Sequence, residues 1–211
     1  MNDLSIIANA IYEGDMDTVV EQTKLAIEQG NSALEILENG LMAGMNHVGK
    51  DFKAGDLFIP EVLIASRAMQ AGMEILQPLL ITQKIKSPGK IVLGTVKGDL
   101  HDIGKNLVSI MLQGAGFEVI DLGVDVSKEV FLEAIEEHKP NLVGMSSLLT
   151  TTMPEMPEII KAIQAAGFRE QVKILVGGAP LNDTYAQAIG ADGYAQNSSF
   201  AVDKAKELLG I

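Results

Sequence analysis

The sequence predicts an α/β protein in which an N-terminal four-helix bundle cap precedes a flavodoxin-like (Rossmann-type), doubly wound five-stranded parallel sheet. Up to about residue 80, apolar residues recur at helical spacing. From residue 90 onward, short apolar runs alternate with helical patterns, which is typical of parallel βαβ units. A polar, basic stretch containing Pro88 and Gly89 separates the two halves. We therefore expect a cap domain at 1–82, a linker at 83–90 and an α/β domain at 91–211.

The first half predicts four helices joined by short connections, the pattern of a small antiparallel bundle. Glycines end three of these helices, while polar residues or a proline begin the later ones, as helix termini favour. The expected helices are one ending near Gly14, one capped by Asp17 and ending at Gly30, one capped by Asn31 or Ser32 and closed by Gly55, and one with Pro60 in its first turn.

The second half predicts five strands in the flavodoxin-like order 2-1-3-4-5. Strands are expected at 90–96, 117–122, 141–146, 172–176 and 193–195, and helices at about 103–114, 127–138, 154–166, 181–189 and 198–209. The loops after the first, third and fourth strands are rich in Gly, Ser or Thr, and they occupy 97–102, 146–153 and 177–181. Because these loops meet at one edge of the sheet, the sequence predicts a binding site there.

The composition argues against several classes of partner and of binding site. The chain has 211 residues, a formal net charge of −12 and no Cys. The negative charge argues against nucleic acid or an anionic membrane as partner, and the missing Cys excludes a disulfide framework or a thiolate metal site. The start is acidic, unlike a secretory signal, and no apolar run is long enough to cross a bilayer. We expect a cytoplasmic protein with no nucleic-acid or membrane partner.

The loop between Gly94 and Asn106 carries candidate functional residues. His101 follows a predicted buried strand and precedes a predicted helix, which is where open α/β sheets bind ligands. The glycines at 94, 98 and 104 allow the backbone to approach a ligand closely. Asp99 lies two residues before His101, so its carboxylate can orient an imidazole that binds a metal.

Three interpretations of this loop are open from these residues. The first is a strand-to-helix turn with His101 in solvent. The second is a phosphate cradle, because Gly98 to Gly104 followed by Lys105 resembles a P-loop. That spacing is one residue too long, and Asn106 stands where Ser or Thr should hold magnesium. The third is a metal ligand supported by Asp99, and the rest of the chain favours it.

Three separated elements carry a resemblance to a known family. They are Asp99-x-His101-x-x-Gly104, Ser146-x-Leu148 and Gly177-Gly178. Together they resemble the cobalamin-binding signature of the B12 domain of methionine synthase and of the corrinoid proteins of methyltransferase systems. The segment 49–61 is similar to the motif of the helical cap that precedes this domain. The resemblance covers nearly the whole chain, and a free-standing cap plus binding domain resembles the small corrinoid proteins that serve methylamines, methanol, methoxylated aromatics or betaines.

The resemblance implies roles for the matching positions. His101 would be the lower axial ligand of cobalt, Asp99 would accept the proton-bearing nitrogen of its ring, and Thr152 would complete this relay with a hydroxyl. Phe52 and Ile59 would shield the upper face of the cobalt. The other positions expected to contact the cofactor or to line the slot for its displaced nucleotide tail are Gly98, Asp102, Ile103, Gly104, Ser146, Leu148, Thr150, Gly177 and Gly178.

The function implied by the resemblance is that of a methyl carrier with a cobalamin or related corrinoid as cofactor. The cobalt would accept a methyl group from a substrate:corrinoid methyltransferase and donate it to a corrinoid:acceptor methyltransferase that acts on a folate or thiol coenzyme. A reductive activase is the third expected partner. The alternatives are a cobalamin-sensing regulator, which would add a DNA-binding or signalling segment, a mutase subunit, which would lack the cap, and a receiver domain, which would need an acidic cluster. The methyl donor and acceptor stay open.

Overall fold

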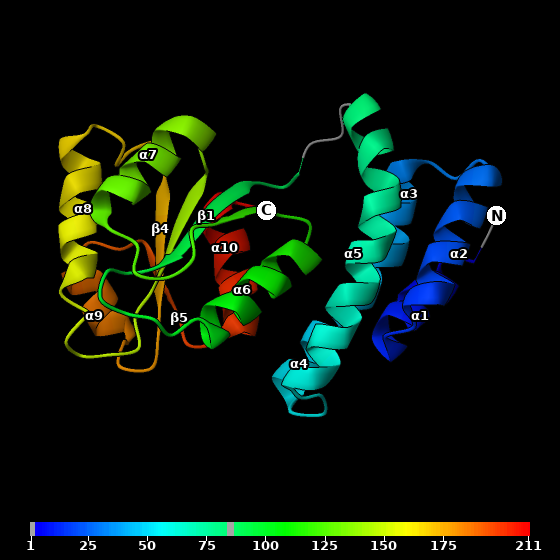
Figure 1. Cartoon of the computed structure of the whole chain (residues 1–211), viewed down its shortest axis with the longest axis horizontal. Coiled ribbons are helices and arrows are strands. Elements are labelled where there is room, and N and C mark those ends of the chain that lie inside the picture. The colour runs from blue at the N-terminus through cyan, green and yellow to red at the C-terminus, as the bar shows by residue number, and fades with distance from the viewer. Residues whose placement is uncertain (1–2, 84–86) are drawn as a thin grey trace. The chain divides into compact units, whose positions relative to one another are not determined.

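The computed structural model describes residues 3–83 and 87–211. The described chain forms two compact units, a helical one built mainly by residues 3–83 and an α/β one that contains most of the chain from Ser87 onward (Figure 1). The expected linker at 83–90 lies partly outside the described residues, namely at 84–86. Lys90, its last expected residue, is the first residue of a strand. None of the described helices is long and apolar enough to cross a membrane.

The helical unit contains six helical segments in chain order. They are α1 (Ser5–Glu13), α2 (Met16–Glu28), α3 (Ala33–Ile36), the π-helical segment η1 (Leu37–Met42), α4 (Ala43–Ala54) and α5 (Ile59–Thr82). Because α3, η1 and α4 follow each other without a break, they form the single third helix that the sequence predicts, with a wider π-helical turn inside it. The described part of the unit is therefore a four-helix bundle in which α3, η1 and α4 form one helix.

Two details of the bundle differ from the sequence prediction. The cap of α2 is Asp15, whose carboxylate accepts the Thr18 backbone N–H at 3.1 Å, and Asp17 lies in the first turn instead. Both aspartates favour a helix N-terminus, so composition alone cannot separate them. Ser32 caps α3 in a reciprocal pair with Glu35.

Apolar side chains from all four helices form the core of the bundle. The residues with at most 1% of their surface exposed include Ile7, Ile11, Val19, Ile36, Leu41, Val48, Val62 and Leu76. A Cβ atom on Gly44 would lie 2.7 Å from the carbonyl oxygen of Ala8. The glycine therefore lets α4 approach the backbone of α1 closely, which a larger residue would prevent.

The α/β unit alternates strands and helices as the sequence predicts, and each observed element boundary lies within two residues of the predicted one. Its elements are β1 (Lys90–Thr95), α6 (Ile103–Gly114), β2 (Glu118–Asp121), α7 (Lys128–His138), β3 (Leu142–Ser146), α8 (Glu155–Ala165), β4 (Lys173–Gly177), α9 (Asp183–Ala188), β5 (Gly193–Ala195) and α10 (Ser198–Leu209). All strand pairs are parallel and the order is β2-β1-β3-β4-β5. This confirms the predicted doubly wound fold.

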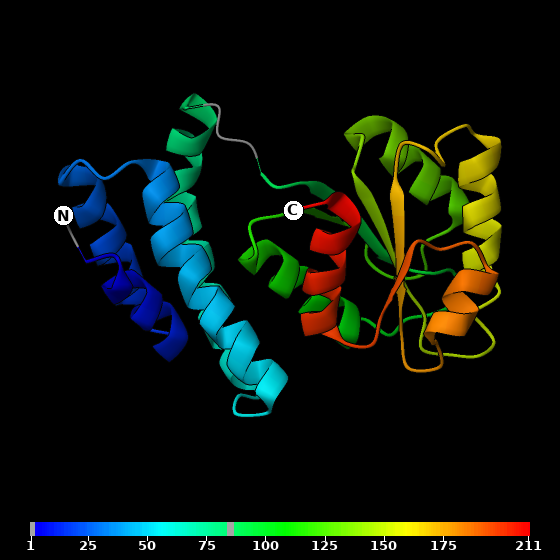
Figure 2. The same cartoon turned by 180° about the vertical axis from the view of Figure 1, so that it is seen from behind.

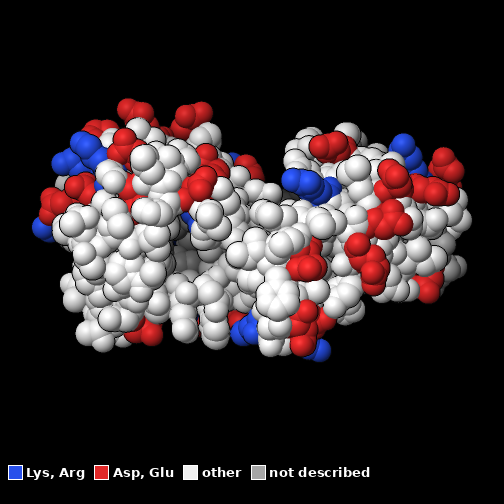
Figure 3. Space-filling view, turned by 60° about the horizontal axis from the view of Figure 1, so that its bottom comes forward, with Lys and Arg blue, Asp and Glu red and all other residues white. Residues whose placement is uncertain are grey.

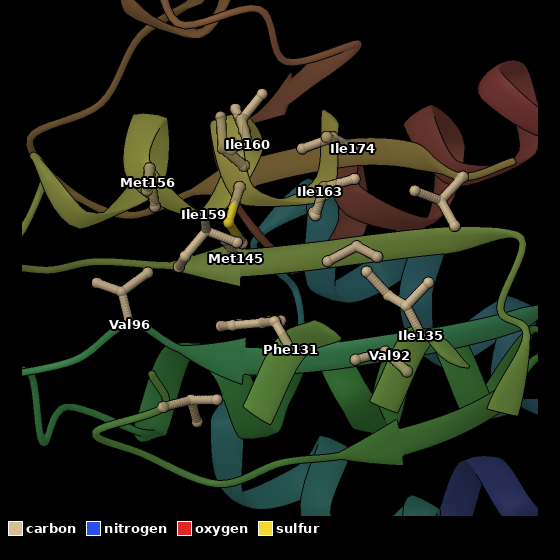
Figure 4. Packing of buried hydrophobic residues seen from close by; sticks show 14 of the residues in the cluster. Val92, Val96, Phe131, Ile135, Met145, Met156, Ile159, Ile160, Ile163 and Ile174 are labelled. Atoms are coloured by element: carbon tan, nitrogen blue, oxygen red, sulfur yellow. The ribbon is translucent and has the colours of Figure 1, made fainter. Parts of the chain in front are cut away.

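Helices cover both faces of the sheet. α6 and α10 lie on one face, and α7, α8 and α9 lie on the other (Figures 1 and 2). Figure 4 shows the core under the second face, where Phe131 and Ile135 of α7 and Met156 of α8 pack against the strands. Gly94 belongs to this core, because a Cβ there would lie 2.9 Å from the Phe131 ring. Its small size serves packing and not, as expected from the sequence, the approach of a ligand.

Candidate functional site

Asp99 is the centre of a hydrogen-bonded group at the carboxyl edge of the sheet. It follows β1 and is fully buried. Its Oδ1 accepts the backbone N–H of His101 at 3.1 Å and lies 2.7 Å from Nδ1 of the same residue. Its Oδ2 accepts the Leu148 N–H at 2.7 Å and the Thr152 hydroxyl at 2.9 Å. The loops after β1 and β3 are therefore joined through one carboxylate.

The surroundings of Asp99 favour its charged form. Burial raises the pKa of the carboxyl group, because a charge is poorly solvated there. The hydrogen bonds from the Leu148 and His101 N–H groups, the His101 ring and the Thr152 hydroxyl lower the pKa, and together they outweigh the effect of burial. The resulting pKa lies well below the ordinary value for Asp, so the group is a carboxylate that only accepts hydrogen bonds.

His101 is held so that one ring nitrogen is free. Because the Asp99 carboxylate only accepts, the proton of the neutral ring sits on Nδ1 and the lone pair is on Nε2. The side chain is 51% exposed, although its partner carboxylate is 0% exposed. A fixed imidazole with an accessible lone pair on Nε2 is the arrangement found in metal-binding histidines.

Thr152 extends this chain of hydrogen bonds into the protein. The residue is buried, and its hydroxyl oxygen lies 2.8 Å from the Ser147 hydroxyl oxygen. Because Thr152 donates to Asp99, Ser147 can donate to Thr152 in turn. Sequence reasoning missed Ser147. Its position directly after Ser146, at the end of a strand, was the signal available, but strand alternation alone does not show which hydroxyl turns toward Thr152.

Exposed apolar side chains lie on the loop that carries His101, at the start of α6 and on the loop after β3. Leu100 is 71% and Ile103 73% exposed, and Leu148 and Leu149 are about 40% exposed. Large apolar side chains that face solvent in a group mark a binding surface. Figure 3 shows that much of the visible surface of the α/β unit carries neither acidic nor basic side chains. The surroundings of the imidazole therefore fit a large, mostly apolar ligand.

The glycines of the predicted site differ in what they make room for. A Cβ on Gly178 would lie 1.8 Å from the Ser147 carbonyl oxygen, and its φ of +137° is one that side chains rarely adopt. Gly178 is thus required for the close approach of the loop after β4 to the loop after β3. A Cβ on Gly177 would meet the Ala195 carbonyl oxygen at 3.1 Å. Beside Gly104, by contrast, there is open space.

Three other predicted residues lie at the same edge without joining the Asp99 group through a hydrogen bond given by the structure. Ser146 ends β3 and is half-buried, with its carbonyl oxygen accepting the Val96 N–H at 3.0 Å. Thr150 is exposed in the loop after β3. Asp102 is exposed and accepts from the Asn106 side chain at 3.1 Å. These residues stay predictions for cofactor contact.

Lys105 is fixed by a partner that the sequence does not reveal. Its side chain is 2% exposed, and its amine forms a short ion pair with Asp121 at the end of β2. The amine also donates to the Asn106 side-chain oxygen at 2.7 Å. With its charge neutralised and buried, Lys105 does not offer a free cation to a phosphate. The structure thus disfavours the P-loop interpretation.

The two predicted cap residues lie in the helical unit. Phe52 is half-buried near the end of α4, and Ile59 is the first residue of α5 and 41% exposed. Phe58, next to Ile59, is 66% exposed. The sequence connects Phe52 and Ile59 only through the resemblance, and their shielding role stays a prediction.

The donor set indicates which kind of metal group fits. Within residues 3–83 and 87–211, no cluster of three or more His, Asp or Glu side chains could hold a metal ion. A single imidazole surrounded by apolar side chains suits a metal that brings its other ligands with it, as the cobalt of a corrin ring does. The residues present therefore fit a corrinoid.

Comparisons with known proteins agree with this assignment. Residues 89–202 match the family described as B12 binding domain, and residues 5–77 match a second family with the same description. The chain is 48% identical over 210 residues to dimethylamine corrinoid protein 1 of Methanosarcina mazei, covering 98% of this chain and 95% of that protein.

Two solved structures are similar over the whole chain. A cobalamin-binding protein from Desulfitobacterium hafniense has a TM-score of 0.80 at 34% identity, with 99% of each chain covered. A chain of the methanol:cobalamin methyltransferase complex from Methanosarcina barkeri has a TM-score of 0.88 at 31% identity, with 98% of this chain and 79% of that chain covered. The chain therefore belongs to the B12-binding family and is a corrinoid protein of a methyltransferase system.

Proposed function

We propose that this corrinoid protein is a methyl carrier that receives its methyl group from a methylated amine. The observation that supports the carrier role most strongly is the fixed imidazole of His101, with Nδ1 bonded to a buried carboxylate and Nε2 free. The similarity to a dimethylamine corrinoid protein supports the amine as donor. When bound, the corrinoid supplies a cobalt centre that can take up and release a methyl group.

The residues of the chain bind and tune this centre. His101 would hold the cobalt through Nε2, and Asp99 keeps the proton of the neutral ring on Nδ1. The Thr152 hydroxyl donates to the second oxygen of Asp99, and the Ser147 hydroxyl oxygen lies 2.8 Å from that of Thr152, so these two hydroxyls would complete the relay.

Apolar residues supply the remaining part of the site. Leu100, Ile103 and Leu148 offer exposed apolar surface beside His101. Phe52 and Ile59 are proposed to shield the other face of the cofactor. The Phe52→Ala variant should then bind hydroxocobalamin as tightly as the wild type, while its reduced cofactor is reoxidised faster by dioxygen. Equal reoxidation rates would make Phe52 a residue of the bundle only.

A carrier of this kind needs partner proteins. We propose a substrate:corrinoid methyltransferase, a corrinoid:acceptor methyltransferase acting on a folate or thiol coenzyme, and a reductive activase. The similarity to a chain of a methanol:cobalamin methyltransferase complex supports the first of these partners. We propose a cytoplasmic location for this protein, as the sequence predicts.

The donor is tested by labelled methyl transfer. The chain is reconstituted with hydroxocobalamin, reduced, and incubated separately with methyltransferases specific for monomethylamine, dimethylamine, trimethylamine and methanol. Each enzyme receives its own substrate carrying ¹⁴C in the methyl group. Label should appear in the protein-bound cofactor with at least one amine, and His101→Ala should reduce this transfer. Labelling from methanol alone would contradict the proposed donor.

A further inference from the structure

Asp125 has a backbone conformation that its place in the fold does not explain. Among the described residues, the non-glycine residues with positive φ are Asp125, at 55°, and Lys139, at 48°. Lys139 follows the end of α7, where a left-handed residue commonly closes a helix. Asp125 lies between β2 and α7 and ends no helix. Asp tolerates the left-handed region better than most residues because its short side chain can form local hydrogen bonds, so the contacts of Asp125 should explain this conformation.

The contacts of Asp125 supply such an explanation. Its carboxylate accepts the Gly98 N–H at 2.7 Å, and its own N–H donates to the Asp99 carbonyl oxygen at 3.0 Å. These two hydrogen bonds lie on either side of the Asp99 residue. The Asp99 N–H donates to the Val96 carbonyl oxygen at 3.1 Å. The backbone that carries the Asp99 side chain is thereby held at three points.

The loop that carries Asp125 is itself fixed to β1. The Val126 N–H donates to the Thr95 carbonyl oxygen at 2.9 Å, and the Thr95 N–H donates to the Gly123 carbonyl oxygen at 3.0 Å. Val96 and Val126 form a parallel bridge beyond the named strands. Asp125 thus rests on the rigid sheet and is not a free surface residue, although its side chain is exposed.

We propose that Asp125 is a positioning residue for the axial histidine. It holds Gly98 and Asp99 so that the Asp99 carboxylate reaches both His101 Nδ1 and the Thr152 hydroxyl. This inference rests on the proposed corrinoid function, because it assumes that Nε2 of His101 binds the cobalt and must be correctly oriented. The hydrogen bonds of Asp125 described above go to Gly98 and to the Asp99 backbone and not to the His101 ring, so its effect passes through the backbone of Asp99.

Three variants separate the effect of the carboxylate as hydrogen-bond acceptor from the effect of the backbone conformation. Asp125→Gly keeps the positive φ accessible but removes the carboxylate. Asp125→Asn keeps both an acceptor oxygen and tolerance of this conformation. Lys139→Gly is the matched control, because it makes the same change at the other described non-glycine position with positive φ, away from the Asp99 backbone.

The first measurement uses the chain without cofactor. Hydrogen exchange of the Gly98 amide, followed by NMR, should be about 10-fold or more faster in Asp125→Gly, as loss of a hydrogen bond to a charged group implies. In Asp125→Asn the rate should rise clearly less, and in Lys139→Gly it should not change. Equal exchange in Asp125→Gly and wild type would overturn the proposal. If Asp125→Gly does not fold, the Gly98 amide shift in Asp125→Asn still decides, because an unchanged shift would show that the carboxylate makes no such bond.

The second measurement uses the chain with its histidines labelled with ¹⁵N, reconstituted with hydroxocobalamin and reduced to cobalt(II), so that a two-line nitrogen splitting identifies a protein ligand. Electron paramagnetic resonance should show a smaller fraction of cobalt with a protein nitrogen ligand in Asp125→Gly, reduced at least twofold, and near wild-type fractions in Asp125→Asn and Lys139→Gly. If His101→Ala also leaves the nitrogen signal unchanged, the proposed function fails. If His101→Ala abolishes the signal but Asp125→Gly does not lower it, only the role of Asp125 fails.

Discussion

Two aspartates of the α/β unit, Asp99 and Asp121, anchor the same segment of chain in opposite ways. Asp99 is buried and bonded to neutral N–H and O–H groups and to the His101 ring. Asp121 is partly exposed and neutralised by the buried cation of Lys105. A carboxylate held by neutral donors keeps its charge available to an imidazole, whereas an ion pair cancels the charge. The difference indicates that the first aspartate serves the chemistry of His101 and the second serves the stability of α6.

Asp121→Asn should produce the largest loss of stability. It leaves the Lys105 amine, on a side chain that is 2% exposed, without its counter-charge. We expect the free energy of unfolding to fall by about 2–4 kcal/mol, somewhat less than for a fully buried pair, because Asp121 itself is partly exposed. Urea unfolding followed by circular dichroism measures this. Lys105→Met is the control and should cost less, since it removes the buried charge. Equal costs for both variants would contradict the role assigned to the pair.

Asp99→Asn should reduce stability less, by about 1–3 kcal/mol, while changing its pH dependence. The pKa of Asp99 is lower in the folded chain than in the unfolded chain. Its carboxylate therefore stabilises the fold fully above the unfolded pKa of about 4, and this contribution is lost as the pH falls through the folded pKa. Between about pH 4 and pH 2, the wild type should lose more stability than Asp99→Asn. Parallel pH profiles of stability for the two proteins would show that the pKa of Asp99 is not the one that is lowered in the folded chain.

Thr152→Val should have the smallest effect of the three, about 1 kcal/mol, because it removes one hydrogen bond to Asp99 and leaves the Ser147 hydroxyl without this partner. Thr152→Ser keeps the hydroxyl and should cost less than half as much. Thermal unfolding of the two variants at the same pH provides the comparison. A serine variant as unstable as the valine variant would show that the methyl group of Thr152, and not its hydroxyl, matters here.

The fold could be predicted well from the sequence because it depends on local patterns. Apolar runs and helical spacing located each strand and helix of the α/β unit, and the alternation predicted the parallel sheet. The prediction of Asp17 as the cap of α2 was wrong, because Asp15 is the cap and both residue positions suit a helix start. The π-helical turn at 37–42 was not predicted either, because an extra residue in a helix hardly disturbs its apolar pattern.

The site was predictable only in part, since much of it depends on contacts between distant loops. Asp99 and His101 are two residues apart, so their pairing could be expected from the sequence. Thr152 was assigned through a resemblance, and the structure brings its hydroxyl within 2.9 Å of Asp99. Asp125 is 27 positions from its partner Gly98, and only the register of β1 and β2 brings them together. No local pattern reports such a contact.

We expect His101, held by Asp99, to bind cobalt through Nε2. The most direct test is electron paramagnetic resonance of the cobalt(II) form after reconstitution with hydroxocobalamin. The chain has three histidines, so labelling them with ¹⁵N changes the nuclear spin at every possible imidazole ligand. The nitrogen splitting should change from three lines to two on labelling and should disappear in His101→Ala. A three-line splitting that survives both changes would come from the cofactor's own base and would show that His101 is not the ligand.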